Sequence, residues 1–309
     1  MRILCLGAGA VGGYFCGRLA EGGSDVTFLV REARQKNIAE HGLRIESKIG
    51  NYTAPVQTVT AAQLRGPYDL IVLTCKAYDL QESMDAIAPA VGPDTAILPL
   101  LNGVAHIEIL NARFGREKVM GGVAKIAATL APDGTIKHLN DWRFIIFGEQ
   151  DGTSTPRALA LKAAFDKTSV IATLVPDIMQ KLWEKLVQLA TVAGLTASMR
   201  ANLGEIARTK HGIAVMAAFL NRNLEISSAE GFPIPKELLE EIRPLFTSTD
   251  SPHAASMMRD VERHGPIEAD HIIGFLLERA VAHGIEPEMH RLIYTNLQAY
   301  EQRRAANRL

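Results

Sequence analysis

The sequence predicts an α/β protein, with a doubly wound parallel sheet in its first half and an all-α domain in its second half. Three observations support this fold class. A short apolar run at residues 1–6 stops at a glycine-rich turn, and a helix-compatible stretch follows at once. Apolar strand-like runs then alternate with helical stretches up to residue 101, which is typical of parallel sheets. Beyond Pro176 the long segments have helical spacing and no convincing strand.

Length and composition are those of an ordinary protein of about two domains. The chain has 309 residues, 47% of them hydrophobic, and a net charge of -1. This charge gives no sign of a nucleic-acid or membrane partner, and no apolar run approaches the ~20 residues that span a bilayer. Cys5, Cys16 and Cys75 are odd in number and lie in apolar contexts, so we expect them to be reduced. We therefore expect a cytoplasmic protein that acts on a small molecule, with a homodimer left open.

The first glycine-rich turn has the G-x-G-x-x-G pattern of a dinucleotide-binding loop. Its cofactor-binding candidates are Gly7, Gly9, Ala10, Val11 and Gly12. In this motif the first glycine makes a tight turn, the second lets the pyrophosphate approach the backbone, and the third lets the helix pack on the strand. The pattern alone is weak, but with its flanking strand and helix it predicts a Rossmann-type domain. The same glycines argue against a signal peptide at the N-terminus.

The second predicted strand, residues 25–30, ends where the adenosine ribose of the cofactor should lie. Arg31 comes next, and together with Arg34 it suits the 2′-phosphate of NADP. Glu32 keeps NAD open, because an acidic residue at this point receives the 2′-hydroxyl of that cofactor. Both arginines could also belong to a solvated loop. The sequence favours NADP (NADPH) as the cofactor.

Two polar residues follow further predicted strands: Lys76 after residues 68–75 and Asn102 after residues 96–101. Open α/β sheets bind their ligands at the carboxyl ends of strands, so the position of both residues makes them cofactor-site candidates. The alternatives are a surface lysine and an Asn-Gly turn. Another strand is expected at residues 52–59.

The pattern changes after residue 123 and predicts an antiparallel extension of the sheet around a Pro-Asp-Gly turn. The elements expected here are strands at residues 125–130, 136–139, 143–147 and 169–174 and a helix at residues 156–167. Helices are then expected at residues 179–193, 212–231, 236–246 and 268–283, with an exposed loop at residues 247–253. We therefore predict a dinucleotide-binding domain over residues 1–175 and an all-helical substrate or catalytic domain over residues 176–309.

The second half carries the residues that discriminate between families with this plan. Residues 181–187, Lys-Leu-Trp-Glu-Lys-Leu-Val, and the Leu-Thr-Ala at residues 195–197 resemble the W-x-K-L segment and the downstream L-T-A of the ketopantoate reductase family. Further matches occur in the same order as in that family, at Arg31, Lys76, residues 101–103 and residues 256–270. The resemblance covers nearly the whole chain.

The resemblance implies NADPH-dependent reduction of a 2-keto acid to a 2-hydroxy acid, as in the reduction of 2-dehydropantoate (ketopantoate) to pantoate. It places Lys185 at the reacting carbonyl, where an ammonium can stabilise the alkoxide left by the hydride and then protonate it. Glu268 matches the acidic residue of the family that binds or orients near this centre, so the resemblance implies Lys185 and Glu268 as the catalytic residues. Ser256 and Asn102 match the polar residues of the family that contact the substrate and the nicotinamide side of the cofactor. Arg31 and Lys76 match the residues that contact the adenosine phosphate.

Each of these helical residues also has a structural interpretation. Lys185 could be one charge on an amphipathic helix, Glu268 an acid that meets a helix dipole, and Ser256 a helix cap. His264 and His271 lie nearby, but neither has metal-ligand spacing to a cysteine or an acidic partner, so we assign no metal.

The chain departs from the family pattern beside the lysine. The family has asparagines one and two turns further along this helix that contact the substrate, whereas this chain has Leu189 and Ala193. Residues i, i+4 and i+8 share one helical face, so the wall beside Lys185 is predicted to be apolar. Gln188 compensates in part. The loss of two amides is expected to relax or redirect the choice of substrate. The predicted substrate contacts on this helix are Lys185, Gln188, Leu189 and Ala193.

The substrate therefore stays open between ketopantoate and a more apolar keto acid. Two further alternatives remain. One is a non-catalytic NADP-binding sensor, for which an acid at the nicotinamide has no use. The other is a different 2-hydroxy acid dehydrogenase with the same two-domain plan, which the Asn102-Gly103 match disfavours.

Overall fold

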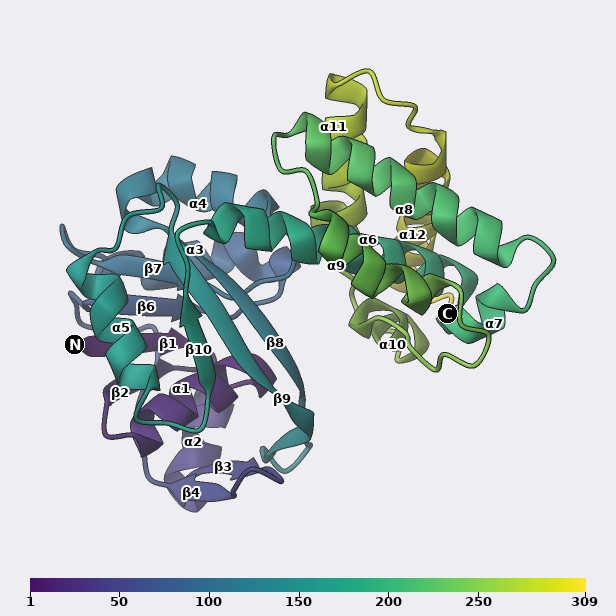
Figure 1. Ribbon diagram of the computed structural model, residues 1–309. Coiled ribbons are helices and arrows are strands. Elements are labelled where there is room, and N and C mark those ends of the chain that lie inside the picture. The colour runs from purple at the N-terminus through teal and green to yellow at the C-terminus, as the bar shows by residue number, and fades with distance from the viewer. The chain divides into compact units, whose positions relative to one another are not determined.

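The computed structural model describes all 309 residues and separates them into two compact units (Figure 1). Unit 1 comprises residues Met1–Leu101 and His106–Lys181, and unit 2 comprises residues Asn102–Ala105 and Leu182–Leu309. The division differs from the predicted boundary at residue 176, because helix α6 (Ile178–Met199) begins in unit 1 and continues without a break into unit 2.

Unit 1 contains a five-stranded parallel sheet in the order β5-β2-β1-β6-β7. Its strands are β1 (Arg2–Leu6), β2 (Asp25–Leu29), β5 (Gln57–Val59), β6 (Leu70–Leu73) and β7 (Ala96–Pro99). The chain moves outward from β1 to β2 and β5 and then returns to the other side of β1 for β6 and β7. This reversal makes the sheet doubly wound, as predicted, and creates the switch point at which such sheets bind ligands.

A second sheet in unit 1 has the order β10-β9-β3-β4, and β8 pairs with β9. Its strands are β3 (Leu43–Glu46), β4 (Tyr52–Ala54), β8 (Met120–Leu130), β9 (Ile136–Glu149) and β10 (Ile171–Leu174). The β8–β9 and β3–β4 pairs are antiparallel, whereas β9 pairs in parallel with both β3 and β10. The predicted antiparallel extension is therefore one pair of a mixed sheet.

Two predicted strands differ in extent from those observed. The strand expected at residues 52–59 is split between the two sheets, with Pro55 directly after β4. Proline has no N–H for a ladder, so it is a natural end for a strand. The strands expected at residues 136–139 and 143–147 are one continuous strand, β9.

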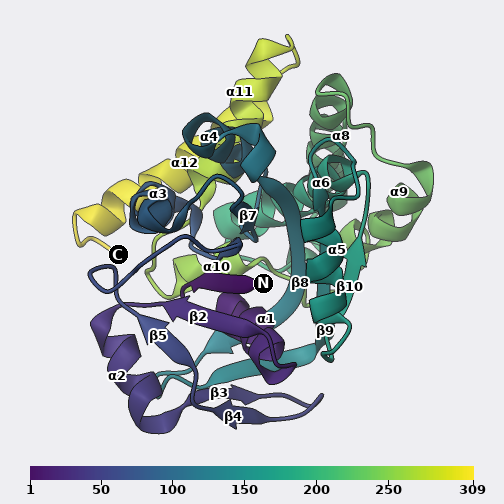
Figure 2. The same cartoon turned by 90° about the vertical axis from the view of Figure 1, so that its left-hand side faces the viewer.

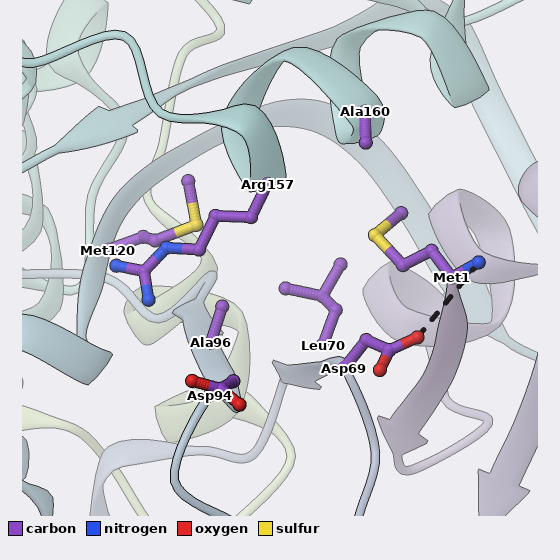
Figure 3. A pocket seen from close by; sticks show the side chains of 8 residues that line it. All are labelled: Met1, Asp69, Leu70, Asp94, Ala96, Met120, Arg157 and Ala160. Carbon is purple, nitrogen blue, oxygen red and sulfur yellow. Dashed lines mark ion pairs between the residues drawn. The ribbon is translucent and has the colours of Figure 1, made fainter.

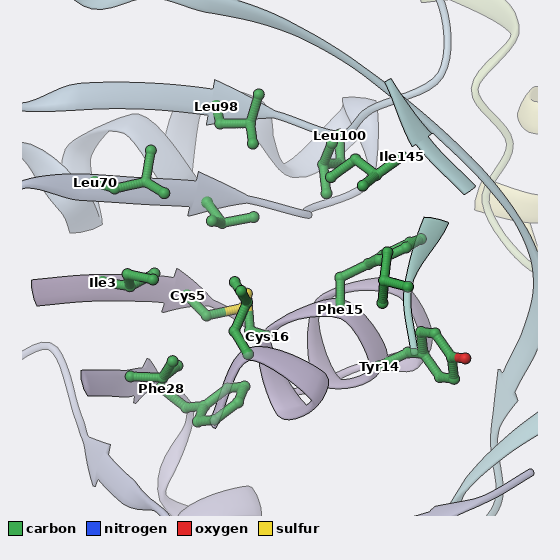
Figure 4. Packing of buried hydrophobic residues seen from close by; sticks show 14 of the residues in the cluster. Ile3, Cys5, Tyr14, Phe15, Cys16, Phe28, Leu70, Leu98, Leu100 and Ile145 are labelled. Atoms are coloured by element: carbon green, nitrogen blue, oxygen red, sulfur yellow. The ribbon is translucent and has the colours of Figure 1, made fainter. Parts of the chain in front are cut away.

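Helix α1 (Ala10–Glu21) lies between the two sheets and contacts strands of both (Figure 2). Its Phe15 and Cys16 pack with Cys5 of β1, Phe28 of β2 and Ile145 of β9, all of them fully buried (Figure 4). Both cysteines are free thiols. Burial, together with a hydrogen bond to Cys16, raises the pKa of the Cys5 thiol, which therefore stays protonated at neutral pH. The other α-helices that lie wholly or mainly in unit 1 are α2 (Glu32–His41), α3 (Leu80–Ile87), α4 (Ala105–Phe114) and α5 (Pro156–Phe165).

Unit 2 is all-α, as predicted. After α6 it contains α7 (Leu203–Ala207), α8 (Gly212–Ala229), α9 (Lys236–Ile242), α10 (Ser256–Glu262), α11 (Phe275–Ala282) and α12 (Glu288–Ala305). A π-helical turn, η5 (Asp270–Gly274), leads into α11. None of the helices combines the length and the hydropathy that a membrane crossing requires.

Helix α6 is anchored in the core of unit 2 at two points. Trp183, 2% exposed, stacks on Phe232 with ring centroids 5.7 Å apart. Two turns further on, Thr191 Oγ1 accepts a hydrogen bond of 2.8 Å from Asn223 Nδ2, and Asn223 Oδ1 lies 2.8 Å from His290 Nε2. These three polar residues are fully buried. Together the two anchors fix the rotation of α6 within unit 2.

Candidate active site

The glycine loop begins where β1 ends. Gly7 has a φ of +90°, a conformation that favours glycine. Gly9 occupies the N-cap position of α1, and a Cβ added there would meet no atom within 4 Å. The packing of the protein therefore does not require a glycine at this position. The open space lies at a helix N-terminus, where N–H groups bind phosphates.

Gly12 has a different role from the other two glycines. A Cβ at this position would overlap Thr74 Oγ1 and would lie 2.7 Å from Gly7 O. Thr74 in turn donates a hydrogen bond of 2.9 Å to Leu6 O, which joins the ends of β6 and β1. Turn, open space and close packing thus fall on the three glycines as the motif requires, so the loop fits a dinucleotide pyrophosphate. Thr74 is a supporting residue that the sequence did not single out.

Three candidate cofactor residues lie at one edge of the parallel sheet. Gly7, Arg31 and Lys76 follow the carboxyl ends of β1, β2 and β6, which are parallel neighbours. Arg31 is the N-cap residue of α2, and its side chain is 82% exposed. Its Nη2 lies 3.7 Å from Glu82 Oε1, and such an exposed ion pair contributes little. Lys76 is half-buried.

Arg34 is engaged by groups of unit 1, whereas the sequence led us to expect it at the cofactor phosphate together with Arg31. Its Nε and Nη2 donate to Ala8 O at 3.2 and 2.9 Å. Its Nη1 donates to Asn37 Oδ1 and to Gly134 O, both at 2.7 Å. These bonds engage all three nitrogens of the guanidinium, so Arg31 is the exposed cation at this end of α2.

In unit 2 the structure brings two predicted residues together. Lys185 of α6 is half-buried, and its Nζ donates a hydrogen bond of 3.0 Å to Asn102 Oδ1. The Asn-Gly turn also packs closely, because Gly103 has a φ of +87° and a Cβ there would lie 3.1 Å from His271 O of the π-helical turn. The backbone of this turn therefore holds Asn102 where its amide meets the lysine.

The other two polar candidates lie at the starts of helical segments of unit 2. Glu268, 5% exposed, immediately precedes the helical residues that lead into η5. Ser256 is the first residue of α10, whose N-cap is Ala255, so Ser256 is not a helix cap. The Ala255 N–H lies 3.4 Å from Thr196 Oγ1 of α6. This contact links the start of α10 to the lysine-bearing helix.

The helix face beyond Lys185 is aliphatic. Leu189 is half-buried, and Ala193 is completely buried. Gln188, which lies beside this row, is half-buried and is the nearest side-chain amide on α6. The backbone is close to its neighbours here, since a Cβ at Gly194 would lie 2.9 Å from the Phe219 ring.

A separate pocket of about 200 Å³ lies at the amino-terminal edge of the parallel sheet of unit 1 (Figure 3). It is smaller than the roughly 300–1,000 Å³ of most ligand sites. Its two cations are already paired. Arg157 donates to both carboxylate oxygens of Glu149, at 2.8 and 2.7 Å, and this pairing raises the pKa of Arg157. The N-terminal ammonium of Met1 lies 4.0 Å from Asp69 Oδ2. The pocket is thus at the opposite edge of the sheet from the glycine loop.

Comparisons with known proteins identify the family of this chain. Residues 3–152 match the family described as ketopantoate reductase PanE/ApbA, and residues 177–301 match its C-terminal model. The uncharacterized oxidoreductase YkpB of Bacillus subtilis is 35% identical over 301 residues, which cover 97% of this chain and 99% of that relative.

Two solved structures have the same fold. The crystal structure of 2-dehydropantoate 2-reductase from Geobacter metallireducens superposes with a TM-score of 0.86 at 28% identity, covering 97% of this chain and 99% of that one. The ternary structure of D-mandelate dehydrogenase with NADH and anilino(oxo)acetate also has a TM-score of 0.86, at 23% identity and 99% coverage of both chains. From its motifs, its fold and these relatives, the chain is an oxidoreductase that belongs to the ketopantoate reductase family.

Proposed function

We propose that this protein reduces a small 2-keto acid to the 2-hydroxy acid with NADPH, and that ketopantoate is the first candidate substrate. The observation that carries the proposal is the 3.0 Å hydrogen bond from Lys185 Nζ to Asn102 Oδ1. An amide oxygen that accepts from an ammonium orients it without neutralising its charge. This hydrogen bond therefore gives the cation a defined direction, and in our proposal the cation acts on an oxyanion.

The chemistry follows from this arrangement. The nicotinamide dinucleotide that the glycine loop would hold would supply the hydride for the carbonyl carbon, which would leave the negative charge on the carbonyl oxygen. The Lys185 ammonium stabilises that oxygen and transfers one proton to it, which yields the hydroxyl group. In this proposal Glu268 and Ser256 are the polar residues that bind or orient the substrate near the lysine.

Arg31 supports NADPH over NADH in this proposal. Its guanidinium is exposed at the start of α2, and only a weak ion pair with Glu82 engages it. A guanidinium suits the 2′-phosphate, which is a dianion that NADH lacks. The neighbouring Glu32 is the feature that favours NADH, the cofactor present in the D-mandelate dehydrogenase structure.

A second candidate substrate is a more apolar keto acid, and one specific observation favours it. Leu189 and Ala193 give the wall beside Lys185 no side-chain amide. An aliphatic surface discriminates less strictly than a hydrogen-bonding one and favours apolar substituents.

Replacement of Lys185 by alanine tests the catalytic role. We expect turnover to fall by about 10²- to 10⁴-fold, the usual contribution of a positioned acid, while the Kd for NADPH in a fluorescence titration stays the same. The Lys181→Ala variant is the matched control, because Lys181 lies one turn earlier and pairs with Asp177 at 3.7 Å. Undiminished turnover in Lys185→Ala would overturn the catalytic role. NADPH binding without turnover of any keto acid by the native protein would favour the sensor.

A panel of 2-keto acids tests the substrate. NADPH oxidation is measured with ketopantoate, with branched aliphatic acids and with phenyl-substituted acids. Ketopantoate turned over at least as fast as any other acid would contradict the argument from Leu189 and Ala193. A preference for the apolar acids would support the second candidate.

A further inference from the structure

Arg34 belongs to helix α2, but its guanidinium contacts the glycine loop of unit 1. Its Nε and Nη2 both donate to Ala8 O, at 3.2 and 2.9 Å. Ala8 is 3% exposed and lies between two glycines, Gly7 and Gly9, whose backbones are intrinsically permissive. A charged pair of N–H donors on this carbonyl is therefore a strong constraint on an otherwise soft segment.

The constraint acts on one peptide plane. The peptide between Ala8 and Gly9 is planar and trans, so its C=O and N–H point in opposite directions. By holding Ala8 O on its own side, Arg34 turns the Gly9 N–H to the other side. Gly9 is the N-cap residue of α1, and the space around its absent side chain is open to 4 Å. We infer that the Gly9 N–H, at this helix N-terminus, is then available to a phosphate oxygen.

We propose that Arg34 is a positioning residue for the cofactor, which acts by fixing the Ala8–Gly9 peptide and thereby strengthens the binding of NADPH and NADH alike. The inference rests on the proposed function only in that a nicotinamide dinucleotide binds at this loop. Arg34 touches the loop and not the ligand in this account.

The tip of the β8–β9 hairpin completes the site of Arg34. Arg34 Nη1 donates to Gly134 O, 100 residues away, and to Asn37 Oδ1, while Asn37 Nδ2 donates to Asp133 O at 3.1 Å. Gly134 has a φ of +86°, and a Cβ there would overlap both Asn37 Oδ1 and Arg34 Nη1. A glycine at this turn therefore allows the guanidinium to lie against the hairpin tip. We infer that the Pro-Asp-Gly turn of the sequence belongs to the support of the cofactor loop.

Replacement of Arg31, the N-cap residue of α2, and replacement of Arg34 within α2 should change cofactor binding in different ways. Arg31 is exposed and suits the 2′-phosphate, so its loss should weaken the binding of NADPH and leave the binding of NADH unchanged. Arg34 acts on the backbone that meets the pyrophosphate, which both cofactors share, so its loss should weaken both by the same factor. A purely structural role for Arg34 would lower stability without changing the dissociation constants of the folded protein.

The experiment measures the Kd of NADPH and of NADH by fluorescence titration, with the Tm of each variant recorded beside it. We expect Arg34→Ala to raise the Kd of both cofactors by about 10-fold or more, in line with the loss of hydrogen bonds from a charged donor. Arg34→Lys should recover part of that loss, because one ammonium can still reach a carbonyl. Arg31→Ala should raise the Kd of NADPH alone.

Gly134→Ala removes the support of Arg34 while keeping the arginine, so it tests the same claim if Arg34→Ala fails to fold. We expect it to weaken both cofactors equally. Gly23→Ala is its matched control, since Gly23 has a φ of +85° with nothing within 4 Å of an added Cβ. Arg44→Ala is a second control, because Arg44 bonds the hairpin at Asp133 O without touching the loop.

Unchanged Kd values in folded Arg34→Ala and Gly134→Ala would overturn the inference, as would a loss confined to NADPH. Equal losses in Arg44→Ala would also overturn it, because general stability of the hairpin would then explain the effect. A native protein that binds neither cofactor would instead overturn the proposed function. The two failures are therefore distinguishable.

Discussion

The glycine loop of unit 1 presents mainly backbone groups, whereas the lysine-bearing helix of unit 2 presents side chains. The loop is backbone, with Gly7 required for its φ, Gly12 for close packing, and Gly9 placed in open space. The helix presents side chains, with Lys185 on Asn102 and an aliphatic row beyond it. A site made of backbone tolerates few substitutions but keeps its ligand class. A site made of side chains can change its specificity at one residue while the fold persists.

Alanine at two of the glycines should separate packing from ligand space, and the largest effect is expected here. Gly12→Ala should lower the free energy of unfolding by about 3 kcal/mol, as overpacking does, because its Cβ would overlap Thr74 Oγ1. Gly9→Ala should leave the Tm unchanged and weaken NADPH binding. Thermal denaturation and cofactor titration of both variants check this. Equal Tm losses would mean that both glycines serve packing.

The buried side-chain network of unit 2 predicts a pH effect that is confined to that unit. Burial lowers the pKa of His290 to about 4, while an unfolded histidine titrates near 6.5. Between these values the unfolded chain binds a proton that the folded protein does not. The contribution of His290 to the free energy of unfolding is therefore fully present above pH ~6.5. It is lost as the pH drops towards ~4, which lowers the free energy of unfolding by roughly 3 kcal/mol.

Urea unfolding at several pH values tests this effect. Trp142→Phe leaves Trp183 as a fluorescence probe within unit 2. His290→Gln should flatten the pH dependence seen by that probe, whereas replacement of the exposed His211 should leave it intact. A profile that His290→Gln does not alter would assign the effect to another group.

An amide returned to the aliphatic face should shift substrate choice. Leu189→Asn should raise kcat/KM for ketopantoate relative to an apolar keto acid by about 10-fold, the worth of one hydrogen bond. Leu189 is half-buried, so the fold should accept the change. Leu189→Met is the apolar control and should keep the native ratio. An unchanged ratio in Leu189→Asn would show that this position does not face the substrate.

The smallest effect is expected at the exposed pair of Arg31 and Glu82. Glu82→Gln removes a competing carboxylate 3.7 Å from the guanidinium. It should lower the Kd of NADPH by about 2-fold or less at low salt, since exposed ion pairs contribute little. The gain should vanish at high ionic strength. Titrations at two salt concentrations measure it, and a gain that persists at high salt would contradict simple charge competition.

Local signals were sufficient to predict most of the fold, and long-range pairing accounts for the differences. The glycine loop and the apolar runs of the parallel sheet are local patterns, so they were predictable. The short strand β3 was missed, because four residues, Leu43–Glu46, carry little periodicity. The polar residues Asn140 and Asp141 interrupt the apolar pattern of β9 and fall at an irregularity of the ladder, between the pairs Ile126–Arg143 and Ala128–His138. The strand β9 pairs with β8 on both sides of this irregularity. Register of this kind is decided by the partner strand.

The candidate site divides in the same way. Asn102 was predicted by its position after a strand, and Lys185 by its motif, and the structure brings them within hydrogen-bond distance. Arg34 was predicted, together with Arg31, to suit the 2′-phosphate of the cofactor. Its actual partners are Ala8 and a hairpin tip 100 residues away. A contact of that sequence separation leaves no trace in the local pattern.

The short segment Asn102–Ala105, which belongs to unit 2 although the residues on both sides of it belong to unit 1, has a practical consequence. A gene fragment that starts at residue 182 would encode nearly all of the helical domain and still omit the amide that orients the lysine. Dissection of this enzyme into independent halves would therefore have to graft four residues from the middle of the first half, or the isolated second half would carry Lys185 without that hydrogen bond.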